Sequence, residues 1–496
     1  MTQAGSLAAL AGAAGIALPA GAGADETVTG FAIDHRKVAP GNVFGAFPGA
    51  RVNGEDFIAA AVAAGAIAVV ARPEARVEGA LHIADATPRR AFARLAGAFY
   101  TPVPATLAAV TGTNGKTSTV EMTRQLWRMA GERAASIGTL GITTPDETVA
   151  TGLTTPDIVT FLANLTGLAR EGVTHVAYEA SSHGLDQFRN EGPRVSVGAF
   201  TNLSRDHLDY HADMDAYFAA KMRLFDEVVA ADGAAVIWED GSEWAARAVF
   251  HASQRGLRLL TVGPAGAGLK LAARTPGALG QVLEVEADGA MHKVNLPLIG
   301  AYQAANALVA AGVVIASGGD TKRTLADLTR LQPVRGRLER AAINRAGAPA
   351  YVDYAHTPDA LEAAIAALKP HLGPAGRLIC VFGAGGDRDA GKRPEMGHIA
   401  AREAQIAIVT DDNPRGEDPA AIRAQILAGT SAGDIREIGD RRQAITAAMS
   451  EARAGDIVLI AGKGHEQGQI VGRGDDARIL PFDDVQVTRE ACGEKA

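Results

Sequence analysis

The chain contains very little cysteine, only Cys380 and Cys492 among 496 residues. Two cysteines cannot build a disulfide framework, so the sequence predicts a protein of a reducing compartment, which we take to be the cytoplasm. A surplus of basic residues is also missing, because 48 Lys and Arg residues stand against 56 Asp and Glu residues. Proteins that bind duplex nucleic acid usually carry such a surplus, and we therefore expect no nucleic-acid partner.

Long hydrophobic runs are missing as well. No stretch of 18 strongly apolar residues occurs, so we expect no membrane span. Residues 6–24 (SLAALAGAAGIALPAGAGA) look like the apolar part of a signal peptide, but the first basic residue is Arg36, and the usual positive segment is missing. We expect instead an alanine-rich helix that packs on its own domain.

What the chain does have is material for several packed cores, with 47% hydrophobic and 21% charged residues. At ~150 residues per domain its length suggests about three domains. The segment Thr101–Pro104, with two prolines, favours an extended linker, and the segment 331–337 is a second turn-rich joint. We therefore predict domains over residues 1–103, 104–335 and 336–496.

Short apolar strands alternate with helical stretches in all three predicted domains, which is typical of an α/β fold with parallel sheets. Residues 269–298 are the exception, because Pro-Gly and Asp-Gly steps there indicate antiparallel hairpins. We predict a central domain resembling phosphate-loop proteins and a Rossmann-like C-terminal domain. The expected strands include residues 42–47, 66–71, 107–110, 175–179, 197–201, 350–354, 378–383, 406–411 and 457–462.

The most informative stretch is the glycine-rich segment 110–119 (VTGTNGKTST), which follows a predicted buried strand and opens a helix. Gly112 and Gly115 allow the backbone to turn tightly around an anion, and the helix N-terminus then faces the phosphates. Lys116 would contribute a positive charge and Thr117 a hydroxyl ligand for magnesium. ATP binding is the best interpretation, although the strict Walker spacing has a glycine where this chain has Val110.

Several ordered motifs then resemble those of the Mur ligases, the family that builds the peptide stem of bacterial peptidoglycan. The resemblance extends from about residue 30 to residue 470. It rests on the segments TGTNGKT (111–117), GLTTPD (152–157), EASSHG (179–184), NLSRDHLDYH (202–211), GAYQAAN (300–306), VDYAHTP (352–358) and GAGGDRD (383–389).

This resemblance implies an ATP-dependent ligase that works through an acyl phosphate. The substrates would be ATP, UDP-N-acetylmuramoyl-L-Ala-D-Glu and an amino acid, with Mg²⁺ as cofactor, and we expect a monomer. The N-terminal domain would bind the UDP-substrate. By match to the family motifs, the residues that would bind ATP are Gly112, Thr113, Asn114, Gly115, Lys116, Thr117, Ser118, Asn306 and Arg337. The residues that would bind the metal are Thr117, Glu179, His207 and Lys221, the last as an N6-carboxylysine.

The dipeptide substrate would contact His35, Thr154, Thr155, Ser181, Gln187 and Arg189 by the same resemblance. His35 stands where the family usually has serine, so its uridine contact departs from the family pattern. Asp353 and His356 match the nucleotide edge of the third domain. Ser181, Ser182, His183 and Asp186 could suggest a hydrolase, but neither serine has the glycine of a nucleophile elbow two residues before it. For the serines, helix capping is an equally good interpretation.

The identity of the added amino acid depends on the third domain, where residues 412–415 (DNPR) resemble the loop of diaminopimelate-adding family members. Diaminopimelate is lysine with an additional carboxylate, and the Arg415 guanidinium can bind that carboxylate through two hydrogen bonds. The diaminopimelate contacts would be Arg388, Asp412, Asn413, Pro414, Arg415, Gly462 and Glu466.

Three alternatives remain. An L-lysine-adding Mur ligase and a folylpolyglutamate synthetase belong to the same class of enzyme, and Arg415 disfavours both. A nucleotide-switch binding protein would use the phosphate loop alone. Such a switch would not need Glu179, His207 and Lys221 together. The spacing of His207 and His211 could suggest zinc, but no cysteine or HExxH pattern supports it.

Overall fold

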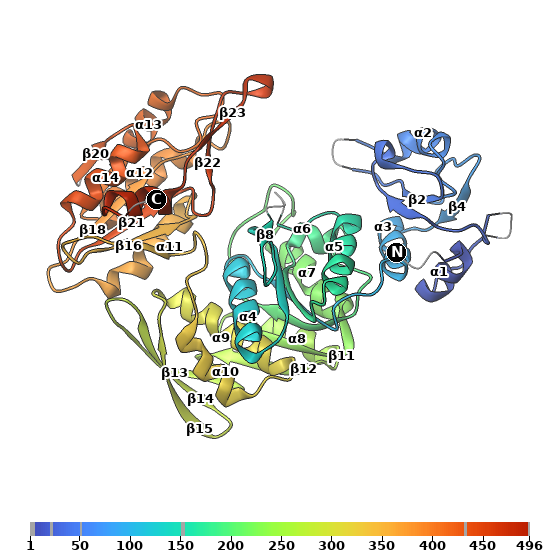
Figure 1. Cartoon of the computed structure of the whole chain (residues 1–496), viewed down its shortest axis with the longest axis horizontal. Coiled ribbons are helices and arrows are strands. Elements are labelled where there is room, and N and C mark those ends of the chain that lie inside the picture. Colours follow the sequence, from blue (N-terminus) through green and yellow to red (C-terminus); the bar gives the residue numbers. More distant parts are fainter. Residues whose placement is uncertain (1–4, 20–22, 50–51, 150–153, 431–433, 495–496) are drawn as a thin grey trace. The chain divides into compact units, whose positions relative to one another are not determined.

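The structure is a computed structural model that describes residues 5–19, 23–49, 52–149, 154–430 and 434–494. The chain forms two compact units. The first comprises Met1–Leu269 with Val309–Asp320, and the second comprises Lys270–Leu308 with Thr321–Ala496. Figure 1 labels the elements of both. The α/β class is confirmed, while the three domain boundaries stay a prediction.

The first unit begins with a small parallel sheet in the order β1-β2-β3-β4. Its strands are β1 (Gly30–Ala32), β2 (Asn42–Gly45), β3 (Ala68–Ala71) and β4 (Leu81–Ala84). The expected alanine-rich helix is present as α1 (Leu7–Ala14), capped by Ser6. Leu7 is fully buried in the same core as helix α3 (Pro88–Phe99), so α1 packs on its own unit as predicted.

The first unit then contributes strands to a larger sheet, in the order β12-β11-β10-β5-β9-β6-β7-β8. The strands from β12 to β6 run parallel, and β7 and β8 are antiparallel. The bounds are β5 (Thr106–Thr111), β6 (Ala134–Gly138), β7 (Gly141–Thr143), β8 (Thr148–Val149), β9 (His175–Glu179), β10 (Val195–Phe200), β11 (Val229–Trp238) and β12 (Arg258–Gly263).

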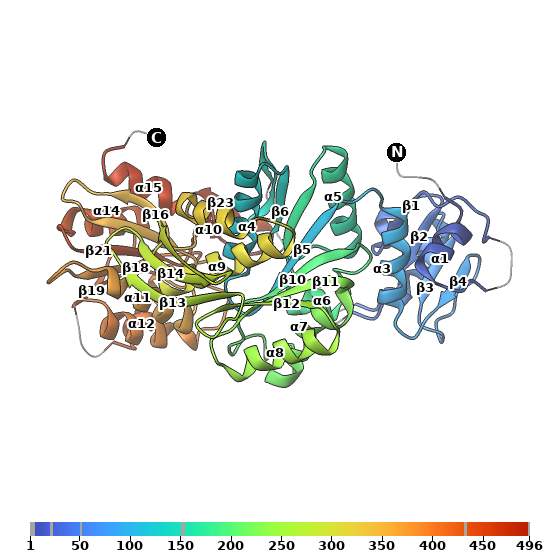
Figure 2. The same cartoon turned by 90° about the horizontal axis from the view of Figure 1, so that it is seen from below.

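Helices cover both faces of this sheet. Helices α7 and α8 lie on one face and α4 on the other (Figure 2). The bounds are α4 (Lys116–Ala130), α5 (Ile158–Arg170), α6 (Ser182–Asp186), α7 (Met214–Arg223) and α8 (Glu243–Gln254), while α2 (Ile58–Ala63) packs on the small sheet. Double coverage explains why β5 reads as a continuous apolar run rather than an alternating one. Because β5 pairs with both β9 and β10, the loops after these three strands meet at one edge.

The second unit contains a sheet in the order β16-β17-β21-β18-β19-β20, with only β16 antiparallel to its neighbour. Leu378, Cys380 and Phe382 of β18 point into one core, and Ile379 and Val381 into the other. Helices α11 and α12 cover the first face and α14 and α15 the second (Figure 2). The strands are β16 (Glu339–Ile343), β17 (Pro349–Asp353), β18 (Leu378–Phe382), β19 (Ile406–Val409), β20 (Asp434–Glu437) and β21 (Ile457–Ala461).

The remaining elements of the second unit include the expected hairpins, β13 (Leu269–Pro276), β14 (Gln281–Ala287) and β15 (Ala290–Leu296), which pair antiparallel in that order. A smaller hairpin joins β22 (Gly468–Val471) to β23 (Arg478–Pro481). The helices are α10 (Thr321–Asp327), α11 (Pro358–Leu368), α12 (Lys392–Glu403), α13 (Pro419–Leu427), α14 (Arg441–Glu451) and α15 (Asp484–Ala491). Helix α9 (Ala301–Ala316) begins in this unit and ends in the first.

Among the helices in the described ranges, none combines the length and apolar character that a membrane crossing requires.

Candidate active site

A glycine-rich loop joins β5 to α4 at the carboxyl edge of the larger sheet. Gly112 has a φ of +146°, and a Cβ atom there would lie 2.0 Å from Oγ1 of Thr201, so only glycine fits. Gly115 has a φ of +87° and directly precedes Lys116, the first residue of α4. Backbone N–H groups of the first helical turn therefore face the loop, which is an arrangement that binds phosphate. The strand–loop–helix geometry predicted from the sequence is present.

Residues that follow β10 hold this loop in shape. The Thr201 hydroxyl donates to the carbonyl oxygen of Asn114 at 2.6 Å. Asn202 accepts from the Asn114 N–H at its Oδ1 (3.0 Å) and from the Thr113 N–H at its carbonyl oxygen (2.9 Å). The Thr113 hydroxyl in turn accepts from the N–H of Ser204 at 3.0 Å. These contacts preorganise the loop, so little ordering remains for a bound phosphate to impose.

Two lysine side chains converge on one carbonyl oxygen of the loop. Lys221 Nζ lies 2.8 Å and Lys116 Nζ 2.9 Å from the Gly112 oxygen, and Lys116 also donates to the Thr113 oxygen at 2.8 Å. Lys221 is only 1% exposed, and its Nζ lies 4.3 Å from the centre of the Tyr217 ring. Burial, followed by the charge of Lys116, lowers the pKa of Lys221 well below its usual value. This position therefore favours a neutral, nucleophilic amine.

Glu179 ends β9 directly beside the loop, paired in register with Val110 of β5. Glu179 is 2% exposed, and its carboxylate accepts from the N–H of Thr139 at 2.7 Å and from the Thr139 hydroxyl at 3.3 Å. That hydroxyl lies 3.0 Å from the hydroxyl of Thr154. Within the described ranges no Lys or Arg pairs with Glu179. A buried carboxylate without a cationic partner is costly, so this site suits a cation.

Among the described residues, the other predicted metal-binding residues do not form a complete metal-binding cluster with Glu179. Thr117 and Ser118 are buried in the first turn of α4. His207 lies in the exposed loop after β10, with its ring 6.0 Å from the Tyr217 ring. Partial burial lowers the pKa of His207, although Asp206 opposes this. Among described residues no group of three His, Cys, Asp or Glu side chains could hold a metal ion.

The predicted dipeptide-binding residues of the first unit form a connected cluster. The Thr155 hydroxyl donates to Oγ of Ser181 at 3.0 Å. Arg189 donates to the Thr155 carbonyl at 3.2 Å and to Oε1 of Gln187 at 2.6 Å. The same Ser181 oxygen accepts from the Gly184 N–H at 3.0 Å, so Ser181 caps α6, as one interpretation of the sequence predicted. Gly152 and Leu153, the first two residues of the GLTTPD motif, lie outside the described residues.

His35 belongs to the N-terminal sheet region and makes different contacts. Its ring stacks on Phe57 with the two centres 4.4 Å apart and the planes within 4° of parallel. Its neighbour Arg36 is paired with Asp34, the residue that caps this short helical turn. A flat, half-exposed ring pair of this kind offers a surface on which another ring can stack.

Asn306 and Arg337 belong to the second unit and are joined there by Gln303, which sequence reasoning missed. The Gln303 amide donates to the Arg337 carbonyl at 2.6 Å, and its oxygen accepts from the Asn306 amide at 3.3 Å. The Arg337 guanidinium lies 4.9 Å from the centre of the Tyr354 ring. This contact is a cation–π interaction, and it places the aromatic ring of Tyr354 next to the positive charge of Arg337.

Asp353, the last residue of β17, is buried. It accepts from the N–H groups of Leu338 at 2.7 Å and Ala355 at 2.9 Å. Burial raises the pKa of Asp353 to about 6, against the lowering effect of Arg337. Burial also lowers the pKa of His356, whose Nδ1 lies 2.8 Å from the Tyr354 carbonyl. Both residues thus lie at the strand edge that the sequence indicated.

The loop 412–415 follows β19 and is fixed by a buried lysine that sequence reasoning also missed. Lys463 is completely buried, donates to Oδ1 of Asn413 at 2.9 Å, and lies 3.5 Å from the Asp412 carboxylate. The same Asn413 oxygen accepts from the Ile470 N–H at 2.9 Å, and its amide donates to Glu466 at 2.8 Å. The Asn413 oxygen is therefore already occupied, and only an amide hydrogen remains for a ligand.

Arg415 is half-buried at the end of the same loop. One guanidinium nitrogen donates to the Gly386 carbonyl at 2.9 Å. Its φ of +51° is unusual for a residue other than glycine, and backbone bonds to Ile470 (3.0 Å) and Gly472 (2.7 Å) hold it there. The backbone is thus set independently of the guanidinium, which keeps further donors for an anion. Arg388, from the neighbouring loop, is exposed.

Gly462 and Glu466 complete the predicted diaminopimelate group. Gly462 has a φ of +120°, and a Cβ atom there would lie 2.5 Å from the Asp412 carboxylate, so the position requires glycine. Burial raises the pKa of Glu466, although the Asn413 amide opposes this shift. Pro414 is buried within the loop. The structure therefore brings Asp412, Asn413, Gly462 and Glu466 together around Lys463.

Comparison with known protein families matched the chain along most of its length. The model of the Mur ligase family catalytic domain matches residues 27–112, and that of the Mur ligase middle domain matches residues 110–314. The model described as the Mur ligase glutamate ligase domain matches residues 336–464.

Individual relatives agree. A protein of Zymomonas mobilis named UDP-N-acetylmuramoyl-L-alanyl-D-glutamate–2,6-diaminopimelate ligase is 59% identical over 467 residues, covering 94% of this chain and 95% of the relative. A protein of the same name from Bradyrhizobium diazoefficiens is 52% identical over 472 residues, covering 94% and 95%. A solved structure, also of a ligase with that name, superimposes with a TM-score of 0.75 at 33% identity, covering 99% of both chains.

Proposed function

The chain belongs to the Mur ligase family, and from this premise we propose that it adds meso-diaminopimelate to UDP-N-acetylmuramoyl-L-Ala-D-Glu during peptidoglycan precursor synthesis. It is an ATP-dependent ligase that forms an amide bond. The observation that carries the choice of amino acid is the 59% identity, over 94% of the chain, to a protein named as the diaminopimelate ligase. The Arg415 loop supports the same choice.

The chemistry explains why ATP is required. A carboxylate does not condense with an amine in water, because oxide would have to leave. Transfer of the terminal phosphoryl group of ATP to the D-Glu γ-carboxylate gives an acyl phosphate. The amine of diaminopimelate then attacks the acyl carbon, and the C–O bond to phosphate breaks. The protein therefore contributes mainly positioning and charge neutralisation.

In the first unit, we assign ATP binding to the loop of residues 112–118. In the second unit, the residues assigned to ATP are Asn306 and Arg337. Lys116 would turn its ammonium from the loop carbonyls toward the outer phosphates, where it neutralises charge that moves during transfer. The backbone N–H groups after Gly115 add fixed dipoles aimed at the same phosphates. The ring of Tyr354 beside Arg337 supports the assignment of Arg337 to a nucleotide.

A magnesium ion fits the donors around Glu179. The buried Glu179 carboxylate, which pairs with no Lys or Arg among the described residues, would hold it, with Thr117 and His207 as further ligands. The neutral Lys221 amine can add to carbon dioxide and release a proton, giving an N6-carboxylysine that carries a negative charge. The negative charge of the modified side chain would be attracted to the Lys116 ammonium, whereas a protonated Lys221 would be repelled by it. The bound ion would supply Lewis-acid stabilisation of phosphoryl oxygens.

The two remaining substrates are assigned one to each unit. Thr154, Thr155, Ser181, Gln187 and Arg189 would bind the dipeptide part, and the stacked ring of His35 would face the nucleotide base. In the second unit Arg415 and Arg388 would bind the distal carboxylate of diaminopimelate. Glu466 would accept its distal ammonium, and Asp412, Asn413, Pro414 and Gly462 would shape the pocket around it.

We also propose a monomeric enzyme in the cytoplasm. The two cysteines are free, with Cys380 buried in the core of the second unit, which accords with a reducing environment. The acidic net charge of −8 suits a protein whose partners are small molecules rather than nucleic acid.

The proposed function is tested by a coupled assay of ADP release. ADP and phosphate are expected only when ATP, the UDP-dipeptide and meso-diaminopimelate are all present, because phosphoryl transfer needs the γ-carboxylate and turnover needs the amine. Steady ADP release without the UDP-dipeptide would contradict the assignment and favour a nucleotide switch.

Replacing Lys221 with alanine tests the proposed modification. We expect kcat to fall about 10²–10³-fold, as when one preorganised charge is removed from a transition state. Added acetate should restore part of the rate, since it supplies the lost carboxylate, and methylamine should not. Lys293→Ala, at an exposed position of β15, is the control and should keep wild-type activity. Restoration by methylamine instead of acetate would contradict a carboxylated lysine.

A further inference from the structure

The last turn of α7 carries Arg223, two residues beyond Lys221, and nothing in the assignments above gives it a role. Its side chain is 16% exposed and contacts four other residues. The guanidinium lies 3.9 Å from the centre of the Phe188 ring and donates to the Leu185 carbonyl. It also donates to Glu191 at 2.8 Å and to Glu227 at 2.7 Å. Three of these four contacts lie in residues 185–191.

The segment 185–191 contains Gln187 and Arg189, which the proposed function assigns to the dipeptide. Phe188, between them, has a φ of +57°, a conformation that bulky side chains rarely adopt. Such a conformation persists only where the surrounding structure holds it. Backbone bonds from the Phe188 N–H to the Leu185 carbonyl (3.1 Å) and from the Arg189 N–H to the Gly184 carbonyl (2.8 Å) close the end of α6 around it. The Arg223 guanidinium, which lies over the Phe188 ring, adds a charged contact to these bonds. The directions of the neighbouring side chains of Gln187 and Arg189 depend on this residue.

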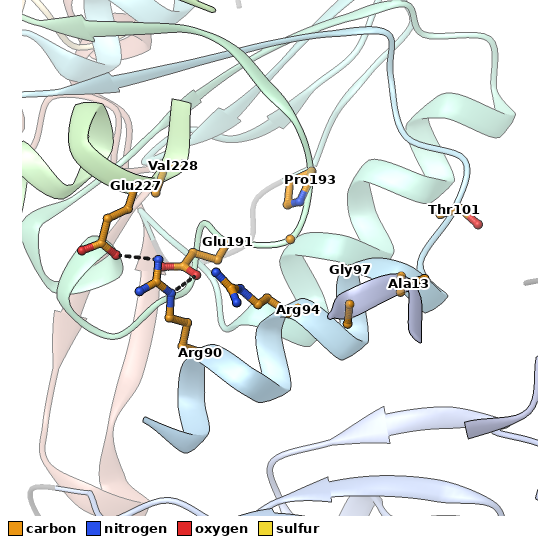
Figure 3. Close-up of a pocket in the computed structure, with 12 residues that line it drawn as sticks. Ala13, Arg90, Arg94, Gly97, Thr101, Glu191, Pro193, Glu227 and Val228 are labelled. Atoms are coloured by element: carbon orange, nitrogen blue, oxygen red, sulfur yellow. Dashed lines mark hydrogen bonds and ion pairs between the residues drawn. The ribbon is translucent and has the colours of Figure 1, made fainter. Parts of the chain in front are cut away.

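A second arginine fixes the end of the segment. Arg90, on α3, reaches between Glu191 and Glu227, with its nitrogens 3.2 Å and 3.1 Å from the two carboxylates (Figure 3). Glu191 and Glu227 thus each lie between Arg90 and Arg223, so the charges alternate around a closed ring. Glu191 is only 7% exposed, and a buried carboxylate of this kind is stable only while it is paired.

Close backbone packing next to Glu191 also holds the end of the segment 185–191 against α3. A Cβ atom on Gly97 of α3 would lie 2.6 Å from the Cα atom of Gly192, so the two backbones touch. A pocket of about 500 Å³ adjoins the ring of charges and is lined by Arg90, Arg94, Glu191 and Glu227 among others (Figure 3).

We propose that Arg223 is a positioning residue for the UDP-dipeptide. It fixes residues 185–191 so that Gln187 and Arg189 present their polar groups in one arrangement, and it does so from the helix that places Lys221 at the phosphate loop. The inference rests on the proposed function, because that function assigns Gln187 and Arg189 to the dipeptide. Arg223 itself touches no substrate in this account.

Steady-state kinetics of Arg223→Gln test the proposal. We expect KM for the UDP-dipeptide to rise about 10- to 100-fold, because a misplaced binding segment loses orientation. KM for ATP and for meso-diaminopimelate should stay within twofold, and kcat at saturation should fall little. Arg170→Gln, which removes an exposed arginine from the last turn of α5, is the control and should behave as wild type.

Two further variants separate positioning from general stability. Arg223→Lys keeps the charge for Glu191 but lacks the flat group that lies over Phe188, so it should restore the melting temperature and not KM. In a double-mutant cycle with Phe188→Ala, the KM effects should be clearly non-additive, because both changes act on one contact.

The outcomes are distinguishable. Equal increases in KM for all three substrates, or an unchanged KM for the UDP-dipeptide, would overturn the positioning role. The proposed function would still hold in that case, provided that the wild-type protein forms the ligation product. A wild-type protein that forms no product from the three substrates would overturn the function and the inference together.

Discussion

Alanine at position 116 is expected to reduce kcat/KM by about 10³-fold or more. The Lys116 ammonium lies at the mouth of the phosphate loop, 2.9 Å from the Gly112 carbonyl and 2.8 Å from that of Thr113. During phosphoryl transfer the negative charge on the outer phosphates shifts, and a fixed cation beside them contributes more to the transition state than to the ground state. The expected loss is comparable with that of other single groups that stabilise a transferring phosphoryl group.

The measurement is ADP release and product formation at saturating substrates, with Lys293→Ala as the control for loss of a lysine at an exposed site. The melting temperature of Lys116→Ala should stay close to that of the wild type. The loop keeps its hydrogen bonds to Thr201 and Asn202, which do not involve the lysine. Product formation at the wild-type rate would show that the ATP site has been misplaced.

Replacing Arg415 with methionine is expected to lower kcat/KM for meso-diaminopimelate about 10²–10³-fold. Methionine keeps the unbranched chain but removes the charge, so the distal carboxylate would be bound without its partner. L-lysine has no carboxylate at that end, and its own weak turnover should change little. The ratio of the two kcat/KM values therefore falls, which is a loss of selectivity rather than a general loss of activity.

The backbone of Arg415 should survive this substitution. Its left-handed conformation is held by main-chain bonds to Ile470 and Gly472, which methionine can also make. Arg402→Met, an exposed position of α12, is the control for removing an arginine from the second unit. An equal decrease for both amino acids would indicate that Arg415 supports the loop and does not read the substrate.

The parts of the fold predicted correctly are those that local sequence determines. Strands β5, β9, β18, β19 and β21 are short apolar runs bounded by turns, and the structure places them within a few residues of the prediction. The phosphate loop was predictable for a related reason. Gly112 and Gly115 both have positive φ angles that favour glycine, and their spacing before Lys116 is visible in the sequence.

The residues that sequence reasoning missed act through distant partners. Lys463 looks like an ordinary loop lysine, and only the fold brings it under Asn413, 50 residues earlier. Thr139 follows a strand without any motif, yet it donates two hydrogen bonds to Glu179. The buried pair of Arg441 and Asp484 also lies in a region without recognised motifs, with partners 43 residues apart. Such contacts depend on sheet order, which local patterns do not specify.

The central claim is tested most directly by a competition experiment read by mass spectrometry. The wild-type protein is given ATP, Mg²⁺ and the UDP-dipeptide together with equal concentrations of meso-diaminopimelate and L-lysine, and the masses of the UDP-linked products are recorded. Our account predicts that the diaminopimelate tripeptide accumulates almost alone, because Arg415 pairs with the additional carboxylate. Comparable amounts of the lysine product, or no UDP-linked tripeptide at all, would contradict it.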